Sequence, residues 1–468
     1  MKFIGWYYGY MSKLVSTNPA DNYAVVGEVK ISTEAEVRAA VTEAHKVKNT
    51  WKEMGVSGRV ALLTPIRDEF AARSHELAAL ISHETGKPLI ESTSEVERYI
   101  EQITWFLENA PIVLADEITH EDATSLHRVV YEPYGVAAAI APWNFPFGMA
   151  VWGVFPNLVA GNTVIFKTSE ECPLVGKLFE KVMCNHELPK GVFSEVYGAG
   201  EVGKSLAESD INLIWFTGST QTGKALYKTA ANKFIKAVLE MGGSSPVLVF
   251  DDVDAARVAP VIFQGRFQHC GQVCTSLKRL IVHENIADKI VAELKTLLEA
   301  QKMGNPIDAT TQVGSLIAKR QLDLAESQLK DALDKGALIA AQTPRPDGLN
   351  GAFIQPTLLR NITKDMRVWR EEVFAPLLPV MTFQSEAEAI KLANDTPYGL
   401  NARVMSVDTE RARRVGSKID AGTIELNYGS RWLTCNPFGG YKDSGLGREL
   451  GAHGLQELSQ IKLISESK

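Results

Sequence analysis

The sequence predicts an α/β protein with mainly parallel sheets, and three observations support this fold class. Short apolar runs at 135–142, 161–169, 211–219 and 245–250 recur along the chain, and segments with helical patterning separate them. Apolar strands that alternate with helices indicate parallel sheets joined by crossover connections. The length of 468 residues exceeds what one hydrophobic core supports, so we expect two or three domains.

The individual elements follow one another in a regular order. An amphipathic helix at 32–54 opens with a capping box formed by Thr33 and Glu36. A second strand series starts at 278–284 and continues through 375–383. The apolar stripe of the first helix consists of Val37, Val41, Ala44, Val47 and Trp51.

Two further segments look like exposed antiparallel strands. The stretch 125–135 alternates in polarity, and the C-terminal stretch 455–465 shows a similar pattern. Peripheral strands of this kind serve subunit contacts in many proteins, and a plain edge strand fits the same pattern.

Composition and charge argue against several classes of protein. The net charge of −7 offers no basic surface for nucleic acid or anionic lipid, and no apolar run of about 18 residues could span a membrane. Five cysteines in a long chain do not suggest a disulfide framework and fit a reducing cytoplasm. The first ten residues lack the cleavage site of a signal peptide, and Met11 is an alternative start to Met1.

Two glycine-rich segments resemble phosphate-binding loops. "GAGEVG" (198–203) matches the dinucleotide pattern, but the acidic residue expected about twenty positions later is missing, so an ordinary glycine turn remains the alternative. "GSTQTGKA" (218–225) has Ala225 where a Mg-ATP loop needs a hydroxyl. Because the free N–H groups of a helix start still bind anions, a phosphate-bearing cofactor is expected there.

The segment "FQHCGQVCTSLKR" (267–279) concentrates possible chemistry. His269, Cys270 and Cys274 could supply three metal ligands, but no second Cys/His pair has zinc-site spacing, so we expect no metal. An attacking cysteine needs a base and a donor for the oxyanion. Glu240 and Asn144 are candidates for these roles, although each taken alone is more often a structural residue.

Seven stretches together resemble the NAD(P)-dependent aldehyde dehydrogenases, in the order and spacing of that family. The likeness covers nearly the whole chain from about Met11, and the overall sequence is nearest the short succinate-semialdehyde dehydrogenase type. The stretches are "PWNFP" (142–146), "GNTVIFKTSE" (161–170), "FTGSTQTGK" (216–224), "LEMGG" (239–243), "GQVCT" (271–275), "EEVFAP" (371–376) and "PFGGYKDSGLGRELG" (437–451).

The resemblance implies three catalytic residues. Cys274 would attack the aldehyde to give a thiohemiacetal, whose oxyanion the Asn144 side chain and the Cys274 backbone N–H would hold. After hydride transfer leaves a thioester, Glu240 would activate the water that releases the acid. CoA-acylating members typically lack this Glu, so acyl transfer to CoA is the less favoured alternative, and a non-catalytic binding or structural protein on the same scaffold is another. Cys270 is either a packing residue or a redox partner that protects Cys274.

The resemblance also implies an NAD site. Lys167 and Glu170 would bind the adenine ribose, and the carboxylate favours NAD over NADP, although Thr168 departs from the usual Pro-type residue. Ser219 would meet the pyrophosphate, while Glu372 and Phe374 would hold the nicotinamide ribose and ring. The other cofactor residues expected from the same motifs are Ala141, Trp143, Ser169, Gly218, Thr222 and Gly242.

The substrate is less well defined by the resemblance. Trp152 occupies a position where carboxylate-binding members carry Arg, and Gln268 stands where another Arg can occur. Arg431 could bind a carboxylate bidentately, or it could be a solvated loop residue. We therefore expect a broad aldehyde dehydrogenase and keep succinic semialdehyde as a candidate substrate. An apolar tunnel would consist of Met149, Trp152, Val273, Thr275 and Trp432.

The family fold implies three parts and an assembly. A Rossmann-like NAD-binding domain would comprise 11–111 and 134–241, and an α/β catalytic domain would comprise 242–450. Residues 112–133 and 451–468 would form a small β oligomerisation flap, so a homodimer or homotetramer is expected.

Overall fold

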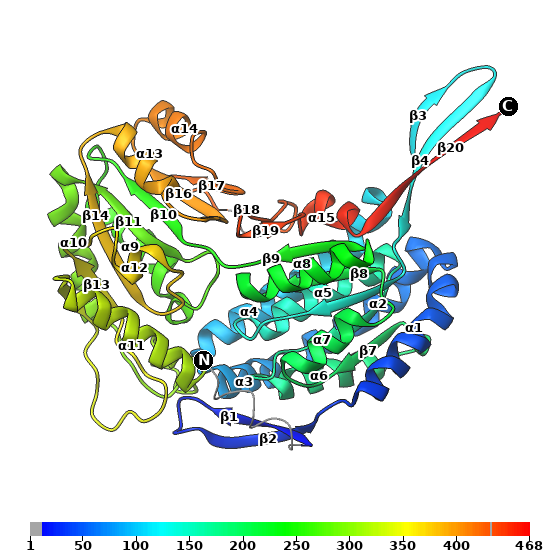
Figure 1. Ribbon diagram of the computed structural model, residues 1–468, viewed down its shortest axis with the longest axis horizontal. Coiled ribbons are helices and arrows are strands. Elements are labelled where there is room, and N and C mark those ends of the chain that lie inside the picture. Colours follow the sequence, from blue (N-terminus) through cyan, green and yellow to red (C-terminus); the bar gives the residue numbers. More distant parts are fainter. Residues whose placement is uncertain (1–11, 431–432) are drawn as a thin grey trace.

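The protein consists of two helix-covered sheets that lie side by side and a small third sheet that projects away from them (Figure 1). The computed structural model describes residues 12–430 and 433–468. The predictions for Met1, Met11, Arg431 and Trp432 fall outside these residues. The α/β class with parallel sheets is confirmed.

The first sheet has, within the described residues, six strands in the order β19-β9-β8-β5-β6-β7. Its pairs are parallel except β19 with β9, which is antiparallel. Apolar side chains are buried on both faces, which explains the continuous apolar runs in the sequence. The strands are β5 (Val136–Ile140), β6 (Thr163–Lys167), β7 (Phe193–Val196), β8 (Leu213–Thr217), β9 (Lys236–Glu240) and β19 (Gly445–Leu446).

Helices cover both faces of this sheet, and a hairpin packs beside them (Figure 1). The expected capping box starts the first helix, because the Thr33 hydroxyl accepts from Glu36 N–H and the Glu36 carboxylate accepts from Thr33 N–H. These elements are β1 (Lys13–Asn18), β2 (Ala24–Lys30), α1 (Glu34–Glu53), α2 (Gly55–Ala72), α3 (Ser74–Thr85), α4 (Leu89–Val113), α5 (Pro146–Ala160), α6 (Pro173–Cys184), α7 (Gly200–Glu208) and α8 (Thr220–Lys233).

The second sheet is described as seven strands in the order β12-β13-β14-β11-β10-β16-β17, of which only β12 runs antiparallel to its neighbour. Its strands are β10 (Ser245–Val249), β11 (Leu277–His283), β12 (Leu338–Gln342), β13 (Thr357–Arg360), β14 (Leu377–Phe383), β16 (Asn401–Met405) and β17 (Thr423–Leu426). Its helices are α9 (Ala255–Phe267), the short η2 (Gln268–Gly271), α10 (Glu284–Glu299), α11 (Lys319–Asp334), α12 (Arg367–Arg370), α13 (Glu386–Asn394) and α14 (Thr409–Gly416). A separate ladder joins β15 (Tyr398–Gly399) to β18 (Tyr441–Lys442).

The third sheet is the antiparallel flap, made of β3 (Glu117–Glu121), β4 (Ser125–Pro133) and β20 (Ser459–Ser467). It extends beyond the two large sheets (Figure 1). An antiparallel strand is present where one was expected at 125–135, but it spans Ser125–Pro133 and is half-buried rather than exposed. The strand expected from residue 455 begins only at Ser459, because Leu455 is buried in the core on helix α15 (Gly451–Glu457). In the described part of the chain, no helix combines the length and apolarity needed to cross a bilayer.

Candidate active site

A cavity of about 280 Å³ lies between the two large sheets. One wall comes from segments that follow β5, β8 and β9, and the opposite wall from segments that precede β11 and β14. Open α/β sheets bind ligands at the carboxyl ends of their strands, which is where the first wall stands. The cavity therefore combines a ligand-binding edge of one sheet with loops of the other.

The cavity brings together most of the predicted site residues. Its lining includes Cys274, Asn144, Glu240, Trp143, Gly218, Ser219, Gly242, Glu372, Phe374, Met149, Trp152 and Val273. Predicted residues that are not part of the lining are Ala141, Lys167, Ser169, Glu170, Thr222, Gln268 and Thr275.

Cys274 follows a sharp left-handed turn. His269, Cys270 and Gly271 have φ values of 48°, 51° and 69°, a backbone conformation that residues other than glycine rarely adopt. The turn redirects the chain from α9 toward the cavity, where Cys274 is half-buried. The amide nitrogen of Asn144 donates to Gln272 O at 3.0 Å, so this side chain is fixed beside the same loop.

A buried ion pair holds the backbone of Asn144 in place. Lys87 Nζ pairs with the carboxylate of Glu95 and donates to Asn144 O at 2.9 Å. Glu95 also accepts from Gly148 N–H at 3.2 Å, near the start of α5. These contacts tie α4, the Asn144 turn and α5 together. Sequence reasoning missed them, because a Lys and a Glu eight residues apart give no signal that they are buried.

Glu240 ends β9 and is 2 % exposed. Within the described chain, neither carboxylate oxygen forms a hydrogen bond of normal geometry. Burial raises the pKa of Glu240 well above its usual range, and the Arg448 charge and the Gly440 N–H offset this only in part. Glu449 is buried nearby, and burial together with the Glu240 charge raises its pKa as well. Sequence reasoning missed Glu449, although it belongs to the quoted "GRELG" stretch.

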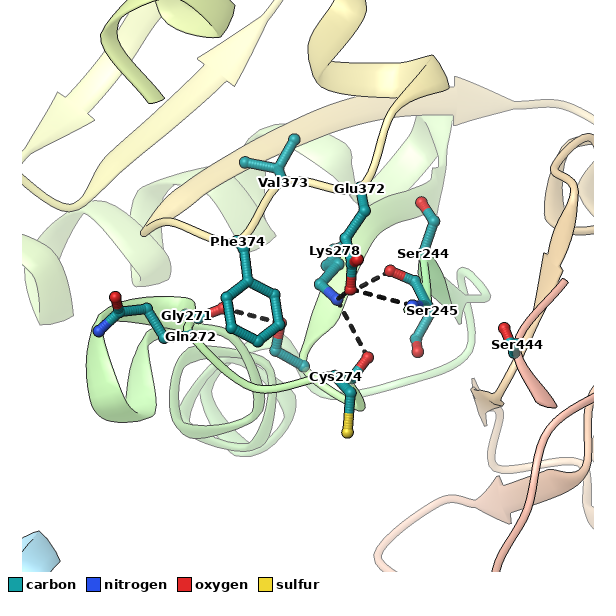
Figure 2. A network of polar contacts seen from close by, with 12 residues as sticks. Ser244, Ser245, Gly271, Gln272, Cys274, Lys278, Glu372, Val373, Phe374 and Ser444 are labelled. Atoms are coloured by element: carbon teal, nitrogen blue, oxygen red, sulfur yellow. Dashed lines mark hydrogen bonds and ion pairs between the residues drawn. The ribbon is translucent and has the colours of Figure 1, made fainter. Parts of the chain in front are cut away.

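A second charged network connects the Cys274 loop to Glu372 (Figure 2). Lys278 Nζ donates to Cys274 O at 3.0 Å, to Gly243 O at 2.8 Å and to Glu372 Oε1 at 2.5 Å. Burial lowers the pKa of Lys278, and the Glu372 carboxylate counteracts this. A β-carbon on Gly242 would collide with the Glu372 carboxylate. A β-carbon on Gly243 would lie 2.7 Å from Cys274 O, so close packing accounts for both glycines that follow Met241.

The groups expected to hold a dinucleotide line one side of the cavity or lie beyond it. Ser219 is the N-cap of α8, and its hydroxyl accepts from Thr222 N–H at 3.3 Å. Lys167 is buried at the end of β6, 3.7 Å from the Glu170 carboxylate, and burial lowers the pKa of Lys167. The Trp143 and Phe374 rings meet edge to face, with centroids 5.5 Å apart.

Aromatic rings form the remaining wall. The Trp152 ring lies 6.1 Å from Tyr99 and 5.3 Å from Phe438, centroid to centroid. The Trp152 indole N–H donates to Gln102, which fixes the ring. Tyr99 was missed because it precedes the "PWNFP" motif by more than forty residues, whereas Phe438 could have been found, since it belongs to the quoted "PFGG".

Cys270 and His269 are both buried, and neither lines the cavity. The Cys270 thiol donates to Gly314 O at 3.4 Å inside the core of the second sheet, and burial raises its pKa. His269 is buried against Phe145, and burial lowers its pKa well below the usual range, so it is neutral. The cysteines are all reduced, and the described residues contain no cluster of ligands for a metal ion.

Comparisons with known proteins agree on one family. The model of the aldehyde dehydrogenase family matches residues 6–464. Aminoaldehyde dehydrogenase 1 of Pisum sativum is 36 % identical over 97 % of this chain and 92 % of its own. The crystal structure of betaine aldehyde dehydrogenase from Staphylococcus aureus with NAD+ has a TM-score of 0.92 and 33 % identity, covering 98 % of this chain and 92 % of its own. An E. coli NADP-dependent enzyme has a TM-score of 0.93 and 32 % identity, covering 97 % and 95 %.

Proposed function

We propose, since the chain belongs to the aldehyde dehydrogenase family, that it oxidises an aldehyde to the free carboxylic acid with NAD as hydride acceptor. The observation that carries this proposal is the convergence of Cys274, Asn144 and Glu240 on one cavity. They come from three distant parts of the sequence, so the convergence is a property of the fold.

The first step uses Cys274 and Asn144. The Cys274 thiolate adds to the aldehyde carbon, and the carbonyl oxygen becomes an oxyanion. The Asn144 amide, held by its bond to Gln272 O, supplies a donor on that side of the cavity. Because Lys87 and Glu95 fix the turn beneath it, this donor needs no rearrangement when charge develops.

The last step uses Glu240. Within the described chain its oxygens form no hydrogen bond of normal geometry, so they can accept from a water molecule. As the carboxylate takes a proton from water, the resulting hydroxide attacks the thioester carbon and Cys274 leaves as thiolate. The presence of Glu240 therefore favours release of the free acid over acyl transfer to CoA. The presence of Cys274, Asn144 and Glu240 together disfavours a non-catalytic role.

The residues present fit a dinucleotide. An N-cap serine with free N–H groups suits phosphate, and a half-buried Glu170 beside Lys167 suits ribose hydroxyls. Glu372 and Phe374 reach the cavity close to Cys274. Bound NAD would supply the hydride acceptor. A carboxylate at position 170 disfavours a 2′-phosphate, so NAD is preferred to NADP.

The aromatic wall suggests the substrate class. Tyr99, Trp152 and Phe438 accept an apolar tail, and their faces also attract an ammonium group. Two relatives are named for aminoaldehydes and betaine aldehyde. We propose a broad specificity that includes cationic and uncharged aldehydes, with succinic semialdehyde dependent on Arg431.

Four aldehydes test this proposal. NAD reduction is measured with propanal, benzaldehyde, aminopropanal and succinic semialdehyde, in wild type, Cys274→Ala and Arg431→Ala. We expect turnover of the first three, none with Cys274→Ala, and little effect of Arg431→Ala. A strong preference for succinic semialdehyde that Arg431→Ala removes through KM would instead identify a semialdehyde dehydrogenase. No turnover of any aldehyde would contradict the function.

For the flap we retain the proposal of subunit contacts. Ile118, Ile461 and Leu463 are exposed on its edge strands, and the Ser459–Ser467 strand has one unpaired edge among the described residues. Size-exclusion chromatography of wild type and Ile461→Lys/Leu463→Lys tests this, with loss of a dimer or tetramer expected.

A further inference from the structure

Arg320 stands at the cofactor side of the cavity without a role in the steps above. It is the second residue of α11 and lines the cavity together with Gln321 and Leu324. Among the described lining residues, it is the only one with a permanent positive charge. Sequence reasoning did not single it out.

The Arg320 guanidinium is held by a single carboxylate. Its Nε and Nη2 donate to Glu171 Oε1 at 3.0 and 2.7 Å. Glu171 follows Glu170 after β6, so the ion pair connects the first sheet to a helix of the second part of the chain. The Arg320 side chain is 52 % exposed, and an exposed pair of this kind contributes little to stability. The guanidinium can therefore exchange partners at small cost.

The surroundings of Arg320 favour an anion. The α11 helix starts without a side-chain cap and without an acidic residue in its first turn. The N-cap Ser219 of α8 contributes to the same cavity. Two helix N-termini and one guanidinium thus border the space, and each attracts negative charge. The pyrophosphate is the anionic part of the expected dinucleotide.

We propose that Arg320 binds the pyrophosphate of the dinucleotide and leaves Glu171 to do so. This inference rests on the proposed placement of NAD in the cavity. The cavity of about 280 Å³ holds only one part of the expected dinucleotide, because Lys167 and Glu170 lie outside its lining. Separation of Arg320 from Glu171 frees a bidentate donor for that ligand.

Equilibrium binding tests the inference without turnover. NADH fluorescence is titrated with wild type, Arg320→Gln, Glu171→Gln and Lys319→Gln. Lys319 is the matched control, because it precedes Arg320 on the same helix, has the same charge and pairs with Asp323 away from the cavity. We expect Arg320→Gln to raise the Kd for NADH about tenfold and to weaken its salt dependence. Lys319→Gln should stay within about twofold.

The Glu171→Gln variant distinguishes two cases: Arg320 leaves Glu171 to bind the ligand, or Arg320 binds the ligand while it stays paired with Glu171. If Glu171 competes for Arg320, its removal lowers the Kd for NADH severalfold. An equal rise of Kd in Glu171→Gln and Arg320→Gln would overturn the exchange, because it would mean that the intact ion pair is what binding needs. An unchanged Kd in Arg320→Gln would overturn the inference altogether.

Two further measurements locate the contact. Displacement of NADH by ADP-ribose, which carries the pyrophosphate without nicotinamide, should weaken by the same factor in Arg320→Gln. Displacement by adenosine should be unaffected, and an equal loss with adenosine would contradict a pyrophosphate contact. Failure of the wild type to bind NADH would count against the proposed function rather than against Arg320.

Discussion

Glu95 and Glu240 are two buried carboxylates near the cavity, with exposures of 3 % and 2 %. They differ in whether they have hydrogen-bond and ion-pair partners. Glu95 pairs with Lys87 and accepts a backbone N–H. Glu240 has no partner of normal geometry among the described residues. A buried carboxylate without a partner costs stability, so its presence at a cavity wall supports the proposal that Glu240 is kept available for reaction.

The difference in partners matches the different roles proposed for the two residues. Lys87 and Glu95 hold the Asn144 turn, which must stay still while charge develops on the substrate. In the proposed reaction, Glu240 accepts a proton from water in the last step, and full pairing of its carboxylate would hinder that. The comparison separates a positioning pair from a reacting group, and the following experiments test that separation.

The largest effect is expected from Glu240→Gln. Without a base, hydrolysis of the thioester slows, so steady-state turnover should fall by about 10²- to 10⁴-fold. The first NADH formed in a stopped-flow experiment should persist, because Cys274 and Asn144 are intact. The control is Glu457→Gln, which removes a carboxylate bonded to Lys236 at the other end of β9 and should retain turnover within about twofold. Loss of the initial NADH burst would mean that Glu240 acts before the thioester forms, which would contradict its proposed role in the last step.

A smaller but clear effect is expected on stability when the positioning pair is broken. Lys87→Met leaves Glu95 buried and unpaired, which should lower the free energy of unfolding in urea by about 3–5 kcal/mol. Lys87→Met/Glu95→Leu should recover most of that loss. Lys330→Met removes half of an exposed pair with Asp334 and should cost at most about 1 kcal/mol. Equal effects of the two single substitutions would show that burial of the Lys87 pair carries no special weight.

The smallest effect is expected from pH. Because burial raises the pKa of Glu240, its basic form increases as pH rises above the usual range of a glutamate, and acid release should accelerate in that direction. The folded pKa exceeds the unfolded value of about 4.3, so the folded state holds more protons and Glu240 makes stability fall as pH rises between the two. Glu240→Gln should flatten both profiles. An unchanged pH profile in Glu240→Gln would assign the dependence to another group, such as the buried Glu449.

The sequence allowed the parallel sheets to be predicted because their strands are buried on both faces and appear as continuous apolar runs. The motif residues could be placed because the seven stretches occur in the order and spacing of the family, and Gly242 also has a physical reason, since a β-carbon there would collide with the Glu372 carboxylate. What could not be predicted depends on contacts between distant segments. The Lys87 bond to Asn144, the Tyr99 ring beside Trp152 and the Arg320 pair with Glu171 join residues 53 to 149 positions apart.

Boundaries were harder to predict than elements. Residues 455–457 resemble the start of the last strand, yet they complete a helix because Leu455 packs into the core. The orientation of Cys270 was also open from sequence. The structure directs its thiol to Gly314 O, which supports the packing role over a redox partnership with Cys274.

The short strand β19 has a consequence for how the chain is made. It borders Glu240 on the edge of a sheet whose other strands lie between residues 136 and 240, yet it consists of residues 445 and 446. A growing chain on the ribosome cannot close this edge until nearly all of its length has been synthesised. The early half must therefore wait with an open strand edge, a state prone to aggregation and a natural target for chaperones.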